Sequence, residues 1–392
     1  MLIKFALRRN LIYPLQYLIW SVLRDFESEL ISSLLDFNGI IYTHLMFLGE
    51  LLGGLIFYLY QKSFFKKEKK TQTSNLFPIE LIESKQNFIK DKKLKIIFII
   101  FSIGFYDFFQ FLLVFPIDKF MTISGSLEKR LRGTYTIYTA LFYYYISRVP
   151  IYKHQLFSLI SIGICLLIVI ITENIFQEFN IFLSYSEFIL ALFLSFLIQF
   201  LCCLEQSLEK YLFEYNKLNP FLVLMIEGIF GFIFSIIYSL FYNPFNDIIK
   251  FKKNNSTFKY IILIIAFIVY IILSGGKNLF RVITTKIYSP MTSTFIVYFL
   301  NPVYLIYYFV SEKDFFSYDK PIYSYFFINL IISLITTFLG CVYNEFIILF
   351  CCELERDTHS QIVKRANESL DPNDDDLDSV SSGYIIPLQN ME

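Results

Sequence analysis

The sequence contains little of what most enzymes use for catalysis. It has three histidines, and it lacks the Gly-x-Ser-x-Gly, His-Glu-x-x-His and Gly-x-x-x-x-Gly-Lys motifs of hydrolases, zinc proteases and phosphate-binding loops. Tyr106-Asp107 matches half of the intramembrane aspartyl protease signature, but the second half, Gly-x-Gly-Asp, is missing. We therefore assign no catalytic residues and do not expect an enzyme.

Cysteine and charge are also scarce. The six cysteines lie in or beside apolar segments without the spacing of a zinc site or a disulfide framework, so no metal or cofactor is expected. Charged residues make up only 17% of the chain, and the formal net charge is zero. No nucleic-acid partner is expected, because such partners bind basic surfaces.

Apolar residues make up most of the chain. Hydrophobic residues are 56% of it and the mean hydropathy is +0.55, values typical of a protein whose solvent is lipid. Because a transmembrane helix needs about 20 apolar residues, 392 residues can hold roughly ten spans. We predict an all-α membrane protein with about ten transmembrane helices. The apolar runs lie at 12–35, 40–60, 94–115, 122–147, 154–172, 187–212, 221–242, 259–282, 288–310 and 323–350.

Charges in the connections predict the orientation. The longest connection, 61–93, is rich in lysine, and the positive-inside rule places it in the cytosol. Ten spans then place both termini in the cytosol too. Lys250 and Lys252, between the seventh and eighth spans, disagree with this rule. After Cys352 the chain becomes polar and acidic, so 353–392 is expected to be a disordered cytosolic tail.

The two halves of the membrane part resemble each other. Residues 35–53 and 213–231 share an acidic residue and an asparagine near the start, then Leu-Met, a glutamate and two glycines, at a nearly constant offset. This predicts two repeats, 1–175 and 176–352, of five spans each. Because five is odd, the second repeat enters the membrane in the opposite sense, which is typical of alternating-access transporters.

Charged residues inside the predicted spans mark candidate sites, because a charge at the bilayer centre costs about 2.5–3.5 kcal/mol and needs a partner or a wet cavity. Asp25 and Glu29 are one helical turn apart in the first span, and Glu205 and Glu209 have the same spacing in the sixth. Two carboxylates on one helix face favour proton coupling. Each pair also has a cation next to it in the sequence, so the alternative to proton coupling is a structural salt bridge.

The remaining candidate residues are either acidic or basic. Glu50 and Glu227 are related by the repeat and lie beside glycines that allow helices to approach closely, so each faces either a cavity or an internal hydrogen-bond partner. Asp107 stands alone in the third span. Arg132 in the fourth span and Lys277 in the eighth would favour an anionic solute.

Both cationic segments also have a simpler interpretation. Glu128 is four residues before Arg132 and would neutralise it within one helix. Arg281, one helical turn after Lys277 on the same helix face, either adds to the cations of a cavity for an anionic solute or, with Lys286, marks a cytosolic helix end, the interpretation that we favour.

Two stretches of the chain carry a family resemblance. The first is Ser124–Gly133 followed by Ile137–Leu141, and the second runs from Glu205 through Glu209-Lys210 and Asn219-Pro220 to Glu227–Phe232. In these stretches the chain resembles the drug/metabolite transporter superfamily, and specifically the nucleotide-sugar-transporter-like solute carriers of family 35 (F type).

The resemblance covers about residues 11–350 and implies a ten-helix inverted repeat with substrate in a central cavity. It also implies an endomembrane location, such as the Golgi or a lysosome-like compartment. The Gly-Ala-Leu-Asn-Lys signature of nucleotide-sugar carriers is absent, and Gly275-Gly276-Lys277-Asn278 matches it only loosely. A nucleotide sugar is therefore one candidate solute among several.

The sequence thus predicts a secondary-active transporter of a small polar or anionic metabolite. Arg132 and Lys277 would bind charge on the solute, and the expected partners are this solute and the lipid bilayer, with a homodimer left open. The alternative is a membrane scaffold or receptor-like protein that keeps the carrier fold without transport. The glutamates that would shape the substrate site are Glu50, Glu205, Glu209 and Glu227, and the candidates for proton coupling are Asp25, Glu29 and Asp107.

Overall fold

The computed structural model describes residues 3–5, 12–35, 41–68, 90–118, 121–122, 125–126, 131–148, 150–175, 185–241, 245–311 and 320–350, with the single residues 354, 356, 358 and 361. Most of these residues are helical. The helices are α1 (Ile12–Leu35), α2 (Ile41–Glu68), α3 (Lys90–Asp118), α5 (Gly133–Ser147), α6 (Lys153–Ile175), α7 (Tyr185–Tyr215), α8 (Pro220–Ser239), α9 (Phe245–Asn254), α10 (Thr257–Ile287), α11 (Pro290–Ser311) and α12 (Lys320–Tyr343).

The helices agree with the predicted apolar runs. One helix occupies each of the ten predicted ranges, and the short α9 is an addition between the seventh and eighth. Within the described residues, seven helices are long and apolar enough to cross a membrane: α2, α3, α6, α7, α8, α10 and α12. The chain is therefore a helical, multi-pass membrane protein. Helix α1 is not among these seven because it carries several charged residues, and α5 is not because it has only 15 residues.

The fourth predicted span, 122–147, is wrong at its start. Helix α5 begins only at Gly133, and before it the strands β2 (Met121–Thr122) and β3 (Gly125–Ser126) form an antiparallel ladder. Arg132 is thus the residue that precedes the helix and not a residue within it. The physical reason is the cluster of charges directly before Gly133, which a lipid-embedded helix would have to bury.

The predicted connection 61–93 is also partly helical, because α2 continues to Glu68 and α3 begins at Lys90. Its centre, 69–89, lies outside the described residues, as does most of the predicted tail 353–392. The last predicted span, 323–350, ends early because α12 stops at Tyr343.

A second short ladder joins the two ends of the membrane part. Strand β1 (Ile3–Phe5) precedes α1, strand β4 (Ile347–Leu349) follows α12, and the two pair antiparallel with Ile3 opposite Leu349. The segments before α1 and after α12 are therefore neighbours.

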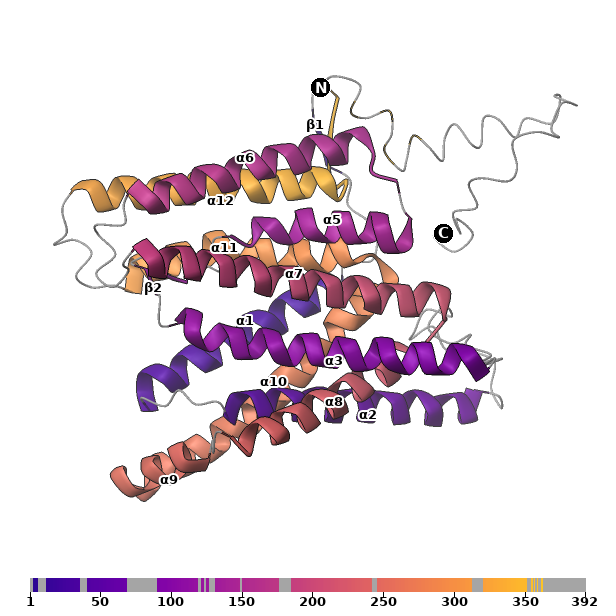
Figure 1. The fold of residues 1–392 in the computed structure, drawn as a ribbon, viewed down its shortest axis with the longest axis vertical. Coiled ribbons are helices and arrows are strands. Elements are labelled where there is room, and N and C mark those ends of the chain that lie inside the picture. Colours follow the sequence, from indigo (N-terminus) through magenta and orange to yellow (C-terminus); the bar gives the residue numbers. More distant parts are fainter. Residues whose placement is uncertain are drawn as a thin grey trace, which may run out of the picture.

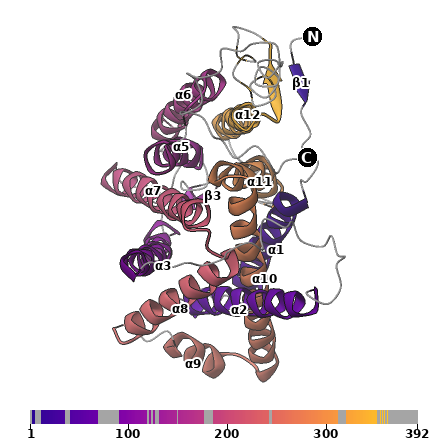
Figure 2. The same cartoon turned by 90° about the vertical axis from the view of Figure 1, so that its right-hand side faces the viewer.

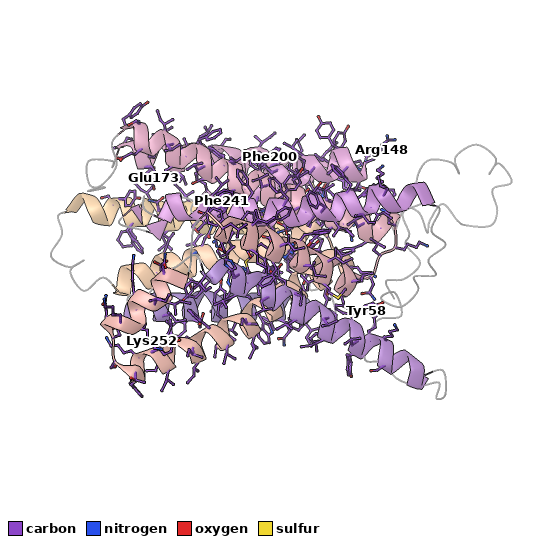
Figure 3. The ribbon with its side chains drawn as sticks, turned by 60° about the horizontal axis from the view of Figure 1, so that its bottom comes forward. Tyr58, Arg148, Glu173, Phe200, Phe241 and Lys252 are labelled. Carbon is purple, nitrogen blue, oxygen red and sulfur yellow. The ribbon has the colours of Figure 1, made fainter. Side chains whose placement is uncertain are left out.

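The helices form a layered bundle. Most of them run side by side in Figure 1, with α6 and α12 in the uppermost layer and α2 and α8 near the bottom, while α1 and α10 cross the others obliquely. Figure 2 views the same bundle nearly along most helix axes. Figure 3 shows Tyr58 and Arg148 towards one end of the bundle and Glu173 and Lys252 towards the other. Helices α2 and α5 thus end towards one side of the bundle, and α6 and α9 end towards the other.

Helices α2 and α8 pack closely and antiparallel. An added Cβ at Gly54 would lie 2.6 Å from the Met225 nitrogen, and one at Gly228 would lie 2.5 Å from the Leu51 nitrogen. Small residues at such contacts let helix backbones approach without clashing. Hydrogen bonds close both ends of this pair, between His44 and Ser239 at one end and between Asn219 and Gln61 at the other.

Helices α6 and α12 are a second antiparallel pair. Near the start of α6, His154 lies 3.4 Å from Glu345, which follows α12. Near the end of α6, buried Glu173 accepts a hydrogen bond from the Tyr325 hydroxyl at 2.7 Å, close to the start of α12.

Helix α10 divides into an apolar half and a polar half. Ser256 caps its N-terminus, and the first turns expose isoleucines such as Ile261 and Ile265, as expected of a face that contacts lipid. The later turns are buried against α1, α2, α7, α8 and α11. Gly275 marks the change, because its backbone lies directly against Gly49 of α2.

We expect Gly275→Ala to destabilise the protein. The added Cβ would lie 2.6 Å from the Gly49 carbonyl oxygen, so α2 and α10 must separate, and such overpacking typically costs about 1–3 kcal/mol. The measurement is the melting temperature in detergent, followed by gel filtration after heating. The matched control is Gly163→Ala, where an added Cβ meets nothing within 4 Å and alanine favours the helix by about 1 kcal/mol. Equal melting temperatures would contradict the close α2–α10 contact.

Candidate functional site

The centre of the candidate site is Arg281 on α10. Its side chain is only 7% exposed. Nη1 lies 2.9 Å from Oε1 of Glu205 and 2.8 Å from Oε1 of Glu209, and Nη2 lies 3.8 Å from Oε2 of Glu227. One guanidinium thus holds three buried carboxyl groups from α7 and α8.

Two side-chain amides complete this cluster. Gln110 of α3 donates a hydrogen bond to Oε2 of Glu205 at 2.8 Å, on the oxygen that Arg281 leaves free. Asn278 of α10, one turn before Arg281, donates to Oε1 of Glu50 of α2. The cluster therefore joins α2, α3, α7, α8 and α10 through polar contacts in the membrane interior.

Carboxyl groups also contact each other in this cluster. The side chains of Glu209 and Glu227 are within hydrogen-bonding distance, and so are those of Asp107 and Glu50. We call the five acidic residues together with Arg281 the Arg281 cluster; its acidic members are Glu50, Asp107, Glu205, Glu209 and Glu227.

A separate group of cations lies beside the Arg281 cluster. Lys277, one turn before Arg281 on α10, interacts electrostatically with Arg24 of α1 and Arg132 at the start of α5, and also with Asp25. Within the described residues, Lys277 Nζ has no hydrogen bond or ion pair. The N-terminus of α5 adds partial positive charge next to Arg132. Of the four residues in this group, three are cations and one is an anion.

The structure brings most of the predicted site residues together. Glu205, Glu209 and Glu227 meet at Arg281, Glu50 joins them through Asn278, and Lys277 and Arg132 share the cationic region. Asp25 is held by Arg24 at 2.8 Å, which is the structural salt bridge that the sequence left as an alternative. Lys210 pairs with Glu214 and donates to the last carbonyls of α10. Glu29 lies in α1, but its side chain is outside those described.

Of the two interpretations of Arg281, the favoured one, a cytosolic helix end, is wrong. Helix α10 continues to Ile287, and Arg281 is buried among acids from helices far away in the sequence. Sequence reasoning also misses Gln110 and Asn278. A repeat signal points to both, because segments 104–110 and 275–281 share a glycine, an Asp or Asn three residues later, and a Gln or Arg six residues later. Gln110 and Arg281, which match in this register, both bind Glu205.

No protein-family model matches this chain, and a search of curated proteins also finds no match.

We expect Arg281→Met to destabilise the protein strongly. It leaves three buried carboxyl groups without their cation, and breaking a buried ion pair from one side costs about 3–5 kcal/mol. The measurement is again the melting temperature in detergent, with Lys95→Met on the exposed part of α3 as the matched control. Adding Glu209→Gln to the Arg281→Met variant should restore part of the loss. Unchanged stability of Arg281→Met would refute the central position of this guanidinium.

Proposed function

We propose that this chain is a secondary-active transporter that moves a small anionic solute by alternating access of two inverted five-helix repeats. The observation that carries the proposal is the antiparallel packing of repeat-related helices around a buried charged centre. Transporters of this architecture bind their substrates near the bilayer midplane, between the repeats.

The packing pattern supports the two repeats. In the predicted repeat, α2 corresponds to α8 and α6 to α12, and each of these pairs packs antiparallel, as inverted copies must. The repeat also pairs α1 with α7 and α3 with α10, and each contact between non-equivalent helices occurs a second time between their counterparts. Helix α1 packs on α10, and its counterpart α7 packs on α3; likewise α2 packs on α10, and its counterpart α8 packs on α3. Such exchange is expected when a two-fold axis in the membrane plane relates the halves.

The ends of the bundle support ten crossings. The β1–β4 ladder pairs the segments before α1 and after α12, and this pairing supports a common side of the bilayer and an even number of crossings between them. Tyr58 and Arg148 share one end of the bundle, opposite Glu173 and Lys252, as alternate crossings demand (Figure 3). The lysine-rich connection after α2 supports a cytosolic location for the first of these ends, and with it for both termini.

The cationic region supports an anionic solute. Arg24 is neutralised by Asp25, whereas Lys277 has no ion-pair partner among the described residues. A half-buried ammonium group near two guanidinium groups attracts an anion, because charge in a low-dielectric site needs compensation. We assign solute binding to Lys277 and Arg132, with the Arg281 cluster bordering the site. Phosphate-bearing metabolites, nucleotide sugars included, have suitable charge.

We expect anions to stabilise the purified, full-length protein. Ligand at 100 times its dissociation constant adds about 2.7 kcal/mol to the unfolding free energy. The probes are inorganic phosphate, sulfate and a uridine diphosphate sugar, with glucose and choline as uncharged and cationic controls. The single tryptophan, Trp20, provides a second readout, because its ring lies on Gly276 beside Lys277.

Lys277→Gln should abolish the anion effect, whereas Lys95→Gln, a matched change at an exposed position on α3, should keep it. Absence of any anion effect on melting temperature and on Trp20 fluorescence would count against transport and in favour of the scaffold alternative.

Side-specific labelling tests the orientation. In a cysteine-free background, Ser74→Cys lies in the lysine-rich connection and Asn254→Cys lies at the end of α9. A membrane-impermeant maleimide should label the first only from the cytosolic side and the second only from the opposite side. Labelling of both positions from one side would rule out the proposed crossings between them.

A further inference from the structure

The Arg281 cluster contains more acid than base. Arg281 is its one cation, and its five acidic members come from α2, α3, α7 and α8. Glu50, Glu205, Glu209 and Glu227 are each at most 3% exposed. If every carboxyl group were ionised, the cluster would bury a large net negative charge inside the bilayer, where even a single charge is unfavourable by a few kcal/mol, on the order of 2.5–3.5.

Some buried carboxyl oxygens of the Arg281 cluster have no hydrogen-bond donor. Oε2 of Glu209 and Oε1 of Glu227 accept no hydrogen bond from the described residues although both atoms are buried, and Oε1 of Glu209 meets the Arg281 guanidinium. An ionised carboxylate only accepts hydrogen bonds, so two carboxyl groups can bond to each other only when one of them carries a proton. The contact between Glu209 and Glu227 meets this condition if the pair shares one proton.

Other charged groups face the cluster from the neighbouring helices. Arg24 and Asp25 of α1 and Arg132 before α5 act on Lys277, and Asp107 interacts with both Lys277 and Arg281. Lys277 and Arg281 are separated by one turn of α10. An anion at Lys277 would therefore lie close to the carboxyl pair, and an added negative charge there favours protonation of that pair.

We propose that Glu209 and Glu227, held by Arg281, form a proton-binding site that couples entry of an anionic solute at Lys277 to a proton carried in the same direction. The proposal rests on the transport function above. In the binding step, a proton from solution attaches to one oxygen of the pair and converts a carboxylate into a carboxylic acid; in release, the same O–H bond breaks on the other side. Because binding linkage is reciprocal, each bound species raises the affinity for the other.

The first test needs no solute. Infrared difference spectroscopy of the full-length protein at neutral pH detects the carbonyl stretch of protonated carboxylic acids. We expect such a band in the wild type, and we expect Glu209→Gln and Glu227→Gln each to remove the intensity of one carboxylic acid. Because the pair shares one proton, the double variant should lose no more than either single variant.

The control for this test is Glu173→Gln, which changes a buried glutamate held by the Tyr325 hydroxyl outside the cluster. It should leave the band assigned to the pair unchanged. No acid band in the wild type at neutral pH, or single variants whose acid band keeps its full wild-type intensity, would overturn the proton site. The absence of any acid band in the wild type would overturn the site even if a variant fails to fold.

The second test measures coupling. Proteoliposomes that contain the full chain and a trapped pH-sensitive dye are given a gradient of radiolabelled sulfate, which does not titrate near neutral pH. In the wild type, sulfate entry should acidify the lumen at a constant ratio of protons to sulfate. In Glu227→Gln this ratio should be lost, whereas Glu173→Gln should keep it.

The outcomes separate the two proposals. Sulfate entry without acidification in the wild type would overturn coupling and leave transport standing. No sulfate entry in the wild type, together with the acid band, would count against transport of this anion and leave the proton site standing.

Discussion

The structure depends on one buried guanidinium group. Arg281 is the only cation in a cluster that draws on five helices, and its partners Glu205, Glu209 and Glu227 would each be unfavourable in the membrane interior without it. Ion pairs of this kind define which helix faces meet, because a carboxyl group turned towards lipid has no partner there. The same residue therefore supports the fold and sets the charge of the candidate site.

The glycine contacts and the charged cluster depend on each other. Gly275 brings α10 against Gly49 of α2, and one turn later the same helix presents Asn278 to Glu50. If α10 moved away from α2, the Asn278–Glu50 hydrogen bond would break and a buried acid would lose its donor. In the transporter that we propose, this close α2–α10 contact lies directly beside the carboxyl pair that we propose to bind a proton.

Much of the fold could be predicted from the sequence, because apolar runs bounded by charge locate membrane helices well, and a helix occupies each predicted range. The start of the fourth span was predicted wrongly, because the range 122–147 included the charges directly before Gly133, where the helix begins. The acids of the site were predictable from their rarity in apolar segments. The role of Arg281 was not, because its partners lie on α7 and α8 and sequence spacing describes only its own helix. Asn278 and Gln110 carry no charge and become visible only when segments 104–110 and 275–281 are compared.

Alternating access of the site between α1, α5 and α10 is the central claim, and the accessibility of position 277 tests it most directly. In a cysteine-free background, Lys277→Cys is treated with a membrane-impermeant thiol reagent from one side of sealed vesicles and then, in a second preparation, from the other side. The account predicts labelling from both sides, since the two repeats expose the site in turn. Labelling from one side only, or from neither, would contradict it.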